Sequence, residues 1–101
     1  MFRRFLVAWF AGSQEGQNDT AIWIADRFQS TWSKPRVVAK VNNEPHWNPV
    51  LFKSPDDRVF LFFKVGSHPS RWQTWLTISK DDGKKWSEPL RFVDQSDHIP
   101  K

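Results

Sequence analysis

The sequence predicts an all-β fold of two four-stranded antiparallel sheets, the first of which lacks its inner strand. Three observations lead to this expectation. Short apolar runs recur along the chain and are bounded by Gly, Pro, Asn, Asp and Ser, which is typical of strands separated by turns. The 101 residues include seven Trp and nine Phe, and such large rings need a packed interior. The third observation is an internal repeat.

The apolar runs give the positions of the strands. The first loop is expected at 12–18 and the second at 42–47. A hairpin turn is expected at 54–57, where Ser, Pro and two Asp gather. The expected strands span residues 4–11, 19–26, 35–41, 48–53, 58–65, 72–79 and 89–93.

The chain aligns with itself when it is shifted by 54 residues without a gap. The apolar run at 5–9 then falls on the run at 59–63. Eight residues are identical in this alignment: Arg4 with Arg58, Gly12 and Ser13 with Gly66 and Ser67, Thr20 with Thr74, Ile24 with Ile78, Trp32 and Ser33 with Trp86 and Ser87, and Pro35 with Pro89. Repeats of this length that are rich in short strands indicate the four-stranded blades of a β-propeller.

The repeat divides the chain into three parts. Residues 42–93 are expected to form a complete blade, whose strands A to D run from the propeller axis outward. Residues 1–41 form an incomplete blade with strands B to D, and residues 94–101 form a tail that leads to a missing next blade. Because a closed propeller needs about four to eight blades, we expect a fragment of a larger protein or a subunit that assembles.

The turn between the last two expected strands carries the most specific motif. Gly83 can adopt a positive φ, and the Asp81 carboxylate and Ser79 hydroxyl can hydrogen-bond to turn N–H groups. Trp86 supplies an apolar plug beneath the turn. This Ser-x-Asp-x-Gly-x-x-Trp pattern, residues 79–86, resembles the Asp box, or bacterial neuraminidase repeat (BNR), of sialidase-like β-propellers. The resemblance implies a structural hairpin that lies away from the substrate.

Residues 27–35 look like a decayed first copy of the same motif. Trp32 is retained, whereas Ala25, Arg27 and Gln29 replace the Ser, Asp and Gly. The expectation is a hairpin that keeps the apolar Trp plug without the polar turn network.

A wider similarity links the chain to one group of sialidase-like proteins, the predicted neuraminidases that carry this repeat. The stretches that carry the similarity are residues 8–16, 21–23, 46–52, 63–66 and 69–72. The resemblance implies a six-bladed propeller, of which this chain covers about two blades. It also implies exo-α-sialidase-like hydrolysis of acidic glycosides.

Propeller topology groups the loops at 12–18, 42–47 and 66–71 on one face, and the resemblance makes this the ligand side. Glu15 and Asp19 are the candidate catalytic residues, because glycoside hydrolysis uses carboxylates as acids and bases. The alternative is a solvated loop Glu and an Asp that caps the start of a strand.

Five residues on this side are candidates for substrate binding. Arg71 can clamp a sugar carboxylate with two parallel hydrogen bonds, or it is a surface Arg stacked on Trp72. His46 and Asn48 flank the start of the inner strand, where a structural His is the alternative. Lys64 ends a strand that faces the same region, and Trp72 offers a ring for stacking on a sugar.

The sequence also departs from the sialidase pattern. Sialidases use a Tyr nucleophile and an Arg cluster drawn from several blades, whereas this chain contains no Tyr. Two functions therefore stay open. The chain is a fragment or subunit of a sialidase-like glycoside hydrolase that acts on acidic sugars, or it is a non-catalytic module that binds glycans or proteins or only self-assembles. In a homotrimer, three copies would supply six blades.

Composition also bears on nucleic-acid binding, metal or cofactor binding and membrane insertion. The 15 basic and 11 acidic residues give a net charge of +4, but the basic residues are scattered, so nucleic-acid binding is not expected. There is no Cys, and no cofactor or metal motif is predicted. No apolar stretch reaches about 18 residues, so no membrane-spanning helix is expected. We interpret the apolar start as a strand rather than a signal peptide, which leaves the cellular location open.

Overall fold

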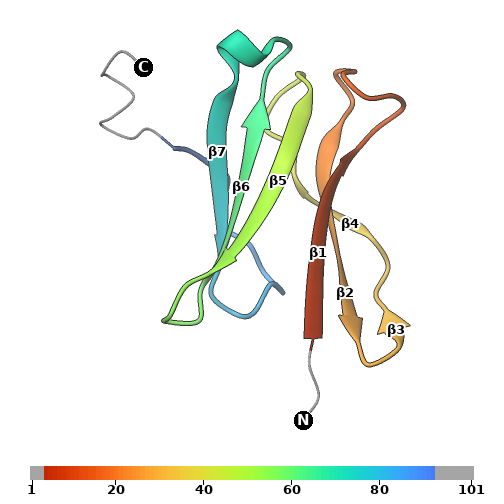
Figure 1. The fold of residues 1–101 in the computed structure, drawn as a ribbon, viewed down its shortest axis with the longest axis vertical. Helices are drawn as coiled ribbons and strands as arrows, with labels where there is room; N and C mark the ends of the chain where they lie inside the picture. The colour runs from red at the N-terminus through yellow and green to blue at the C-terminus, as the bar shows by residue number, and fades with distance from the viewer. Residues whose placement is uncertain (1–3, 93–101) are drawn as a thin grey trace.

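The computed structural model describes residues 4–92, which form two antiparallel β-sheets lying side by side (Figure 1). The prediction of an all-β fold with two sheets is confirmed. The first sheet contains β1 (Arg4–Ala11), β2 (Ala21–Phe28), β3 (Thr31–Trp32) and β4 (Arg36–Ala39). The second sheet contains β5 (His46–Lys53), β6 (Val59–Val65), β7 (Gln73–Ser79) and β8 (Leu90–Arg91), and a short 3-10 turn, η1 (Pro69–Arg71), precedes β7.

The first sheet has three strand positions. β1 pairs with β2 over its whole length, from Arg4 opposite Phe28 to Ala11 opposite Ala21. β3 and β4 both pair with β2, so they are two segments of one outer strand. Within the described residues no strand pairs with the other edge of β1. This is the arrangement expected of a blade without its inner strand.

The second sheet has the order β5-β6-β7-β8. Its inner strand begins at His46, two residues earlier than expected, and the register shifts between Trp47 and Val50. The outer strand β8 is shorter than the expected strand at 89–93. Val93 and the expected tail at 94–101 lie outside the described residues.

The core lies between the two sheets and is built from alternate residues of each strand. In β2 the inward residues are Ile22 and Ile24, and in β6 they are Leu61, Phe63 and Val65, all at most 1% exposed. Successive side chains of a strand point to opposite faces of its sheet. Each sheet therefore also has an outward face, which is turned away from the other sheet.

The pairing register corrects the gapless repeat. Ala8 pairs with Ile24 as Phe62 pairs with Leu76, so β1 matches β6 at an offset of 54 while β2 matches β7 at an offset of 52. The connection at 12–20 is two residues longer than its counterpart at 66–72. The following hairpin is two residues shorter, which restores the offset of 54 in the outer strands. The gapless match of Ile24 with Ile78 was therefore wrong.

The expectation that Trp32 forms a plug beneath its turn is also wrong. The shorter hairpin closes through Gln29 and Ser30, so Trp32 stays in strand pairing with Arg27 and is 52% exposed. The Arg27 guanidinium lies 6.0 Å from the centre of the Trp32 ring. Trp86, in contrast, packs against the core cluster. Without the two extra residues, the chain does not curl back far enough to bury the ring.

Candidate functional site

The connections between strands gather at two ends of the molecule (Figure 1). We call one end the loop end; it carries the connections at 12–20, 40–45 and 66–72. The other, the turn end, carries the hairpins at 29–30 and 54–57 and the Asp box. All candidate catalytic and substrate-binding residues lie at or near the loop end.

His46 is fully buried beneath the loop end. Its Nε2 accepts a hydrogen bond from the Val41 N–H at 2.9 Å, so Nδ1 carries the proton and donates to the Glu44 carbonyl at 2.8 Å. The ring stacks on Phe63, and the backbone N–H of His46 donates to the Thr20 hydroxyl. Burial lowers the pKa of His46. With both ring nitrogens used, His46 fastens the connection at 40–45 to the core.

Lys40 holds the loops of the first sheet together. Its ammonium donates to the backbone carbonyls of Asn18, Thr20 and Glu44, which belong to two different connections. Burial lowers the pKa of Lys40, and the nearby negative charge of Asp19 opposes this effect. Lys40 was not among the predicted site residues, because the sequence gives no sign of which carbonyls it reaches.

Asp19 shapes the longest connection at this end. Its carboxylate accepts hydrogen bonds from the N–H and the hydroxyl of Ser13, each at 3.1 Å. Gly12 is required beside it, since a Cβ there would lie 2.8 Å from both Asp19 Oδ1 and Thr20 Cα. Both carboxylate oxygens are therefore engaged within the loop. Glu15 is exposed at the same loop, where the described residues offer its carboxylate no hydrogen bond or ion pair.

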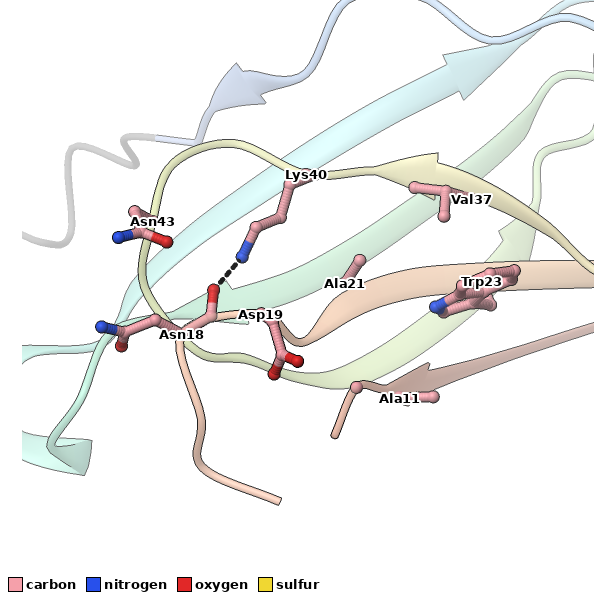
Figure 2. Close-up of a pocket in the computed structure, with 9 residues that line it drawn as sticks. Ala11, Asn18, Asp19, Ala21, Trp23, Val37, Lys40 and Asn43 are labelled. Carbon is pink, nitrogen blue, oxygen red and sulfur yellow. Dashed lines mark hydrogen bonds between the residues drawn. The ribbon is translucent and has the colours of Figure 1, made fainter. Parts of the chain in front are cut away.

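Asp19 and Lys40 border a groove of about 570 Å³ on the outward face of the first sheet, which we call the first groove (Figure 2). Figure 2 shows Asp19, Lys40 and Asn43 toward one end of this groove and Trp23 and Val37 toward the other. The complete lining is Ala11, Gly12, Asn18, Asp19, Ala21, Trp23, Val37, Lys40 and Asn43. An aromatic ring beside amide and charged groups is a surface that suits a polar ligand.

An aromatic cluster joins the two sheets at the loop end. Trp47 contacts Phe10 of the first sheet, with ring centres 5.6 Å apart, and stacks on Trp72 at 5.4 Å. The Trp47 indole N–H donates to the Gly66 carbonyl at 2.8 Å. The buried Nε1 of Trp72 has no acceptor among the described residues. Trp72 is therefore largely a packing residue, and it also lines a second groove.

Asn48 lies at the register shift of β5 and has φ of +49°. A non-glycine residue with positive φ is uncommon, and bulges of this kind often redirect a side chain near a functional site. Asn48 is exposed and belongs to the inner strand. The signal in the sequence that could have found this conformation is the Asn48-Pro49 pair, because Asn is enriched at positive φ and Pro within a strand marks an edge or a bulge.

The second groove lies on the outward face of the second sheet and has a volume of about 460 Å³. The Lys64 ammonium donates to the Thr74 hydroxyl at 2.6 Å across the paired strands β6 and β7. Arg91 of β8 supplies a second cation. The complete lining is Lys64, Ser70, Trp72, Gln73, Thr74, Arg91 and Phe92, which includes no carboxylate. Arg91 was missed in the sequence because it carries no motif.

Arg71 is exposed at the end of η1 and does not line either groove. The structure thus brings Lys64 and Trp72 together and places Asp19 in the other groove, on the opposite side of the molecule. Glu15, His46, Asn48 and Arg71 lie outside both linings.

The Asp box at the turn end is a closed polar network. The buried Ser79 hydroxyl donates to the Asp81 carboxylate at 2.8 Å and accepts from the Gly83 N–H at 2.8 Å. Asp81 also accepts from the Lys85 N–H, and these two bonds, that from Lys85 first, lower the pKa of Asp81. Gly83 has φ of +90°, and its carbonyl accepts from the Trp86 indole at 3.0 Å.

The same turn also contacts the first sheet. The Arg36 guanidinium donates to the Gly83 carbonyl at 3.1 Å and forms an ion pair with Asp26 at 3.2 Å. This contact fixes the two sheets to each other at the turn end. It gives the Asp box a structural function that the turn sequence alone does not reveal, because Arg36 lies 47 residues earlier.

Two further features bear on the choice of chemistry. Among residues 4–92, no group of three or more His, Asp or Glu side chains is close enough to share a metal ion. In the same part of the chain, no helix is long and apolar enough to cross a membrane.

The comparison with known proteins agrees with this architecture. Residues 3–100 match the family described as BNR repeat-like domain. No curated protein sequence matches the chain. The match covers nearly all of the chain, and the structure contains both the paired antiparallel sheets and the Asp-box network. The chain therefore belongs to the BNR repeat-like family, the sialidase-type family of Asp-box proteins.

Proposed function

We propose that the second groove binds the acid group of a sugar, as part of a sialidase-like, carbohydrate-active propeller. One observation carries this proposal: the groove is lined by Lys64 and Arg91 together with hydroxyl and amide groups, and no carboxylate is among its lining residues. Hydrogen bonds from a charged donor to a carboxylate are about twice as strong as those between neutral groups. Ser70, Thr74 and Gln73 supply partners for sugar hydroxyls.

The internal repeat supports a ligand at this position. At the pairing register of the sheets, Lys64 and Thr74 correspond to Phe10 and Ile22 of the first sheet. Ile22 is fully buried and Phe10 packs against the core, so the first copy of the position is apolar. Replacing this apolar pair by an ammonium and a hydroxyl weakens packing. A polar ligand would account for the exchange.

The finer proposal is exo-acting hydrolysis of an acidic glycoside, with Glu15 and Asp19 as the carboxylates. It is supported by the position of both at the loop end and by the exposed Glu15 carboxylate, which has no hydrogen bond or ion pair among residues 4–92. Because Asp19 lines the first groove, on the opposite side of the molecule, the carboxylates that act on a sugar in the second groove would come from a neighbouring copy. The second candidate is a glycan-binding module without hydrolysis, which is favoured by the absence of Tyr and by the engagement of both Asp19 oxygens with Ser13.

Titration with monosaccharides tests the binding proposal. N-Acetylneuraminic acid or glucuronic acid is expected to quench the fluorescence of Trp72 or shift its indole NMR signal, whereas glucose is not. Lys64→Met and Arg91→Met should each weaken binding by at least about tenfold, since a hydrogen bond to a charged group contributes about 1.5–3 kcal/mol. Lys84→Met, at the turn end, is the matched control.

Two results would overturn the proposal: equal binding of glucose and the acidic sugars, or unchanged binding by both groove variants. Release of an aryl alcohol from an aryl glycoside of an acidic sugar tests hydrolysis separately. Activity that is lost in Glu15→Gln with binding retained would support the finer proposal. Binding without any release would favour the non-hydrolytic module.

A further inference from the structure

We propose that copies of this chain associate head to tail, with the outward face of the second sheet of one copy packed on the outward face of the first sheet of the next. We call these surfaces the second and first open faces. The first consists of Phe5, Val7, Trp9, Trp23 and Val37. The second consists of Val50, Phe52, Phe60, Phe62, Leu76, Leu90 and Phe92.

Both faces expose large apolar side chains. On the first, Phe5 is 55% and Val37 is 49% exposed. On the second, Val50 is 59% and Phe52 is 55% exposed. A contiguous apolar patch of several such residues is unusual on the surface of a monomer and marks an interaction site. The two patches lie on opposite sides of the molecule, because each is turned away from the core between the sheets.

The internal interface identifies the partner of each face. Within one chain, the inward residues of the first sheet pack on the inward residues of the second. By the repeat, Phe5, Val7 and Trp9 of the first open face correspond to Val59, Leu61 and Phe63, which are the inward residues of the second sheet.

The second open face corresponds in the same way to the other side of that interface. Phe60, Phe62 and Leu76 occupy the positions of Leu6, Ala8 and Ile24, which are inward residues of the first sheet. The two open faces are thus repeat copies of two surfaces that already pack together. A second copy of the chain therefore offers each open face the kind of surface that its counterpart contacts inside the molecule.

Such an interface joins two different surfaces, so it leaves one open face at each end of a chain of copies. A heterologous interface of this kind either closes into a ring or continues as a filament. Sheets that twist as blades close when about four to eight are present. Two, three or four copies, each with two sheets, meet this condition, and three copies give the six-bladed ring of the homotrimer expected above.

Association would also bring the two grooves to one boundary. Each lies at the loop end of an open face, so the first groove of one copy would face the second groove of its neighbour. Inside the chain, this position is filled by the start of β5, with Trp47 against Phe10 and the His46 N–H bonded to Thr20. Among residues 4–92, the first sheet has no such strand.

Light scattering on a size-exclusion column measures the association directly, whether or not a sugar binds. The expected mass of the 101-residue chain is two, three or four times 12.0 kDa. Val7→Asp removes the first open face and Phe52→Asp the second, so each variant alone should run as a monomer of 12.0 kDa. Ser30→Asp, at the exposed turn end, should keep the mass of the unsubstituted chain.

Mixing the two variants distinguishes a head-to-tail interface from a symmetric one. Val7→Asp keeps its second open face and Phe52→Asp keeps its first, so an equimolar mixture should form a dimer of one copy of each and nothing larger. Near-UV circular dichroism of the separate variants verifies that each remains folded. A monomeric unsubstituted chain, a variant that keeps the full mass, or a mixture of folded variants that stays monomeric would each overturn the proposal.

Discussion

The outer hairpins of the two sheets connect equivalent strands by turns of different length and structure. In the first sheet, the strands are joined by a tight turn at Gln29 and Ser30. In the second, the Asp box adds two residues, a network centred on Ser79 and a Trp ring beneath the turn. The shared element is a Ser hydroxyl directly after the aligned Trp: Ser33 accepts a hydrogen bond from the Asp26 N–H, and Ser87 accepts one from the Ile78 N–H.

This comparison shows that Trp is buried by the length of the hairpin rather than by its position in the repeat. Trp32 and Trp86 align in the repeat, yet one is paired in a strand and exposed, and the other packs on the core. The side-chain network of the Asp box stabilises a longer loop that would otherwise lack regular hydrogen bonds. That longer loop also allows the large apolar Trp86 ring to pack on the core.

The loop ends differ in the same instructive way. In the first sheet, Phe10 and Ile22 are covered by the start of β5, and His46 completes the hydrogen bonds of the connection. In the second sheet, the corresponding Lys64 and Thr74 line an open groove. One copy of the position is therefore used for packing, and the other is available for a ligand.

Replacing the two aligned Trp residues tests the comparison with the largest expected effect. Trp86→Ala should lower the free energy of unfolding by about 2–4 kcal/mol, since it removes a ring packed on the core and its bond to Gly83. Trp32→Ala should change it by less than about 1 kcal/mol, because the ring is largely exposed. Urea unfolding at one fixed protein concentration measures both, and similar losses would contradict our account of the hairpins.

The buried His46 predicts an effect of pH on the loop end of the first sheet. Burial lowers the pKa of His46 in the folded chain, where Lys40 and Glu44 are the nearby charged groups. In the unfolded chain, the His46 side chain is protonated near its ordinary pKa of about 6.5. The unfolded state then binds more protons, so stability is complete above about pH 6.5 and falls as the pH drops toward the folded-state pKa. The slope for one proton is at most about 1.4 kcal/mol per pH unit.

His46→Gln separates this effect from the titration of the carboxylates. The variant should be less stable at pH 8, because its amide does not reproduce both bonds of the ring. It should also lose the part of the pH dependence that His46 contributes below about pH 6.5. Urea midpoints measured from pH 8 to pH 5 compare the two proteins. Parallel curves would show that His46 does not carry the expected proton difference.

The smallest expected effects come from the backbone of the two turns. Gly83→Ala should cost about 1 kcal/mol, because φ of +90° strains a residue with a Cβ. Gln29→Gly should stabilise the first hairpin by less than about 1 kcal/mol, since Gln29 already has φ of +58°. Thermal unfolding resolves both, as about 1 kcal/mol shifts the Tm by about 4–8 °C in a domain of this size. A stabilising Gly83→Ala would be inconsistent with the turn geometry.

Strand order and the Asp box were predictable because both depend on local patterns. Apolar residues at every second position of a strand indicate which side chains pack in the core. Ser79, Asp81 and Gly83 form their hydrogen bonds within a few residues of one another. The residues of the candidate site were harder to predict from the sequence. Lys64 and Trp72 were identified by their place beside loops, whereas Arg91, Lys40 and Arg36 have contacts that are distant along the chain.

The sequence by itself determined the fold class, the order of the strands and the Asp-box turn. Only the tertiary structure decided the exchange of two residues between a connection and the following hairpin, because a repeat alignment does not measure strand register. It also decided the environments of Trp32, Trp86 and His46. Those environments depend on how one sheet covers the other, which is a property of packing between distant segments rather than of any local pattern.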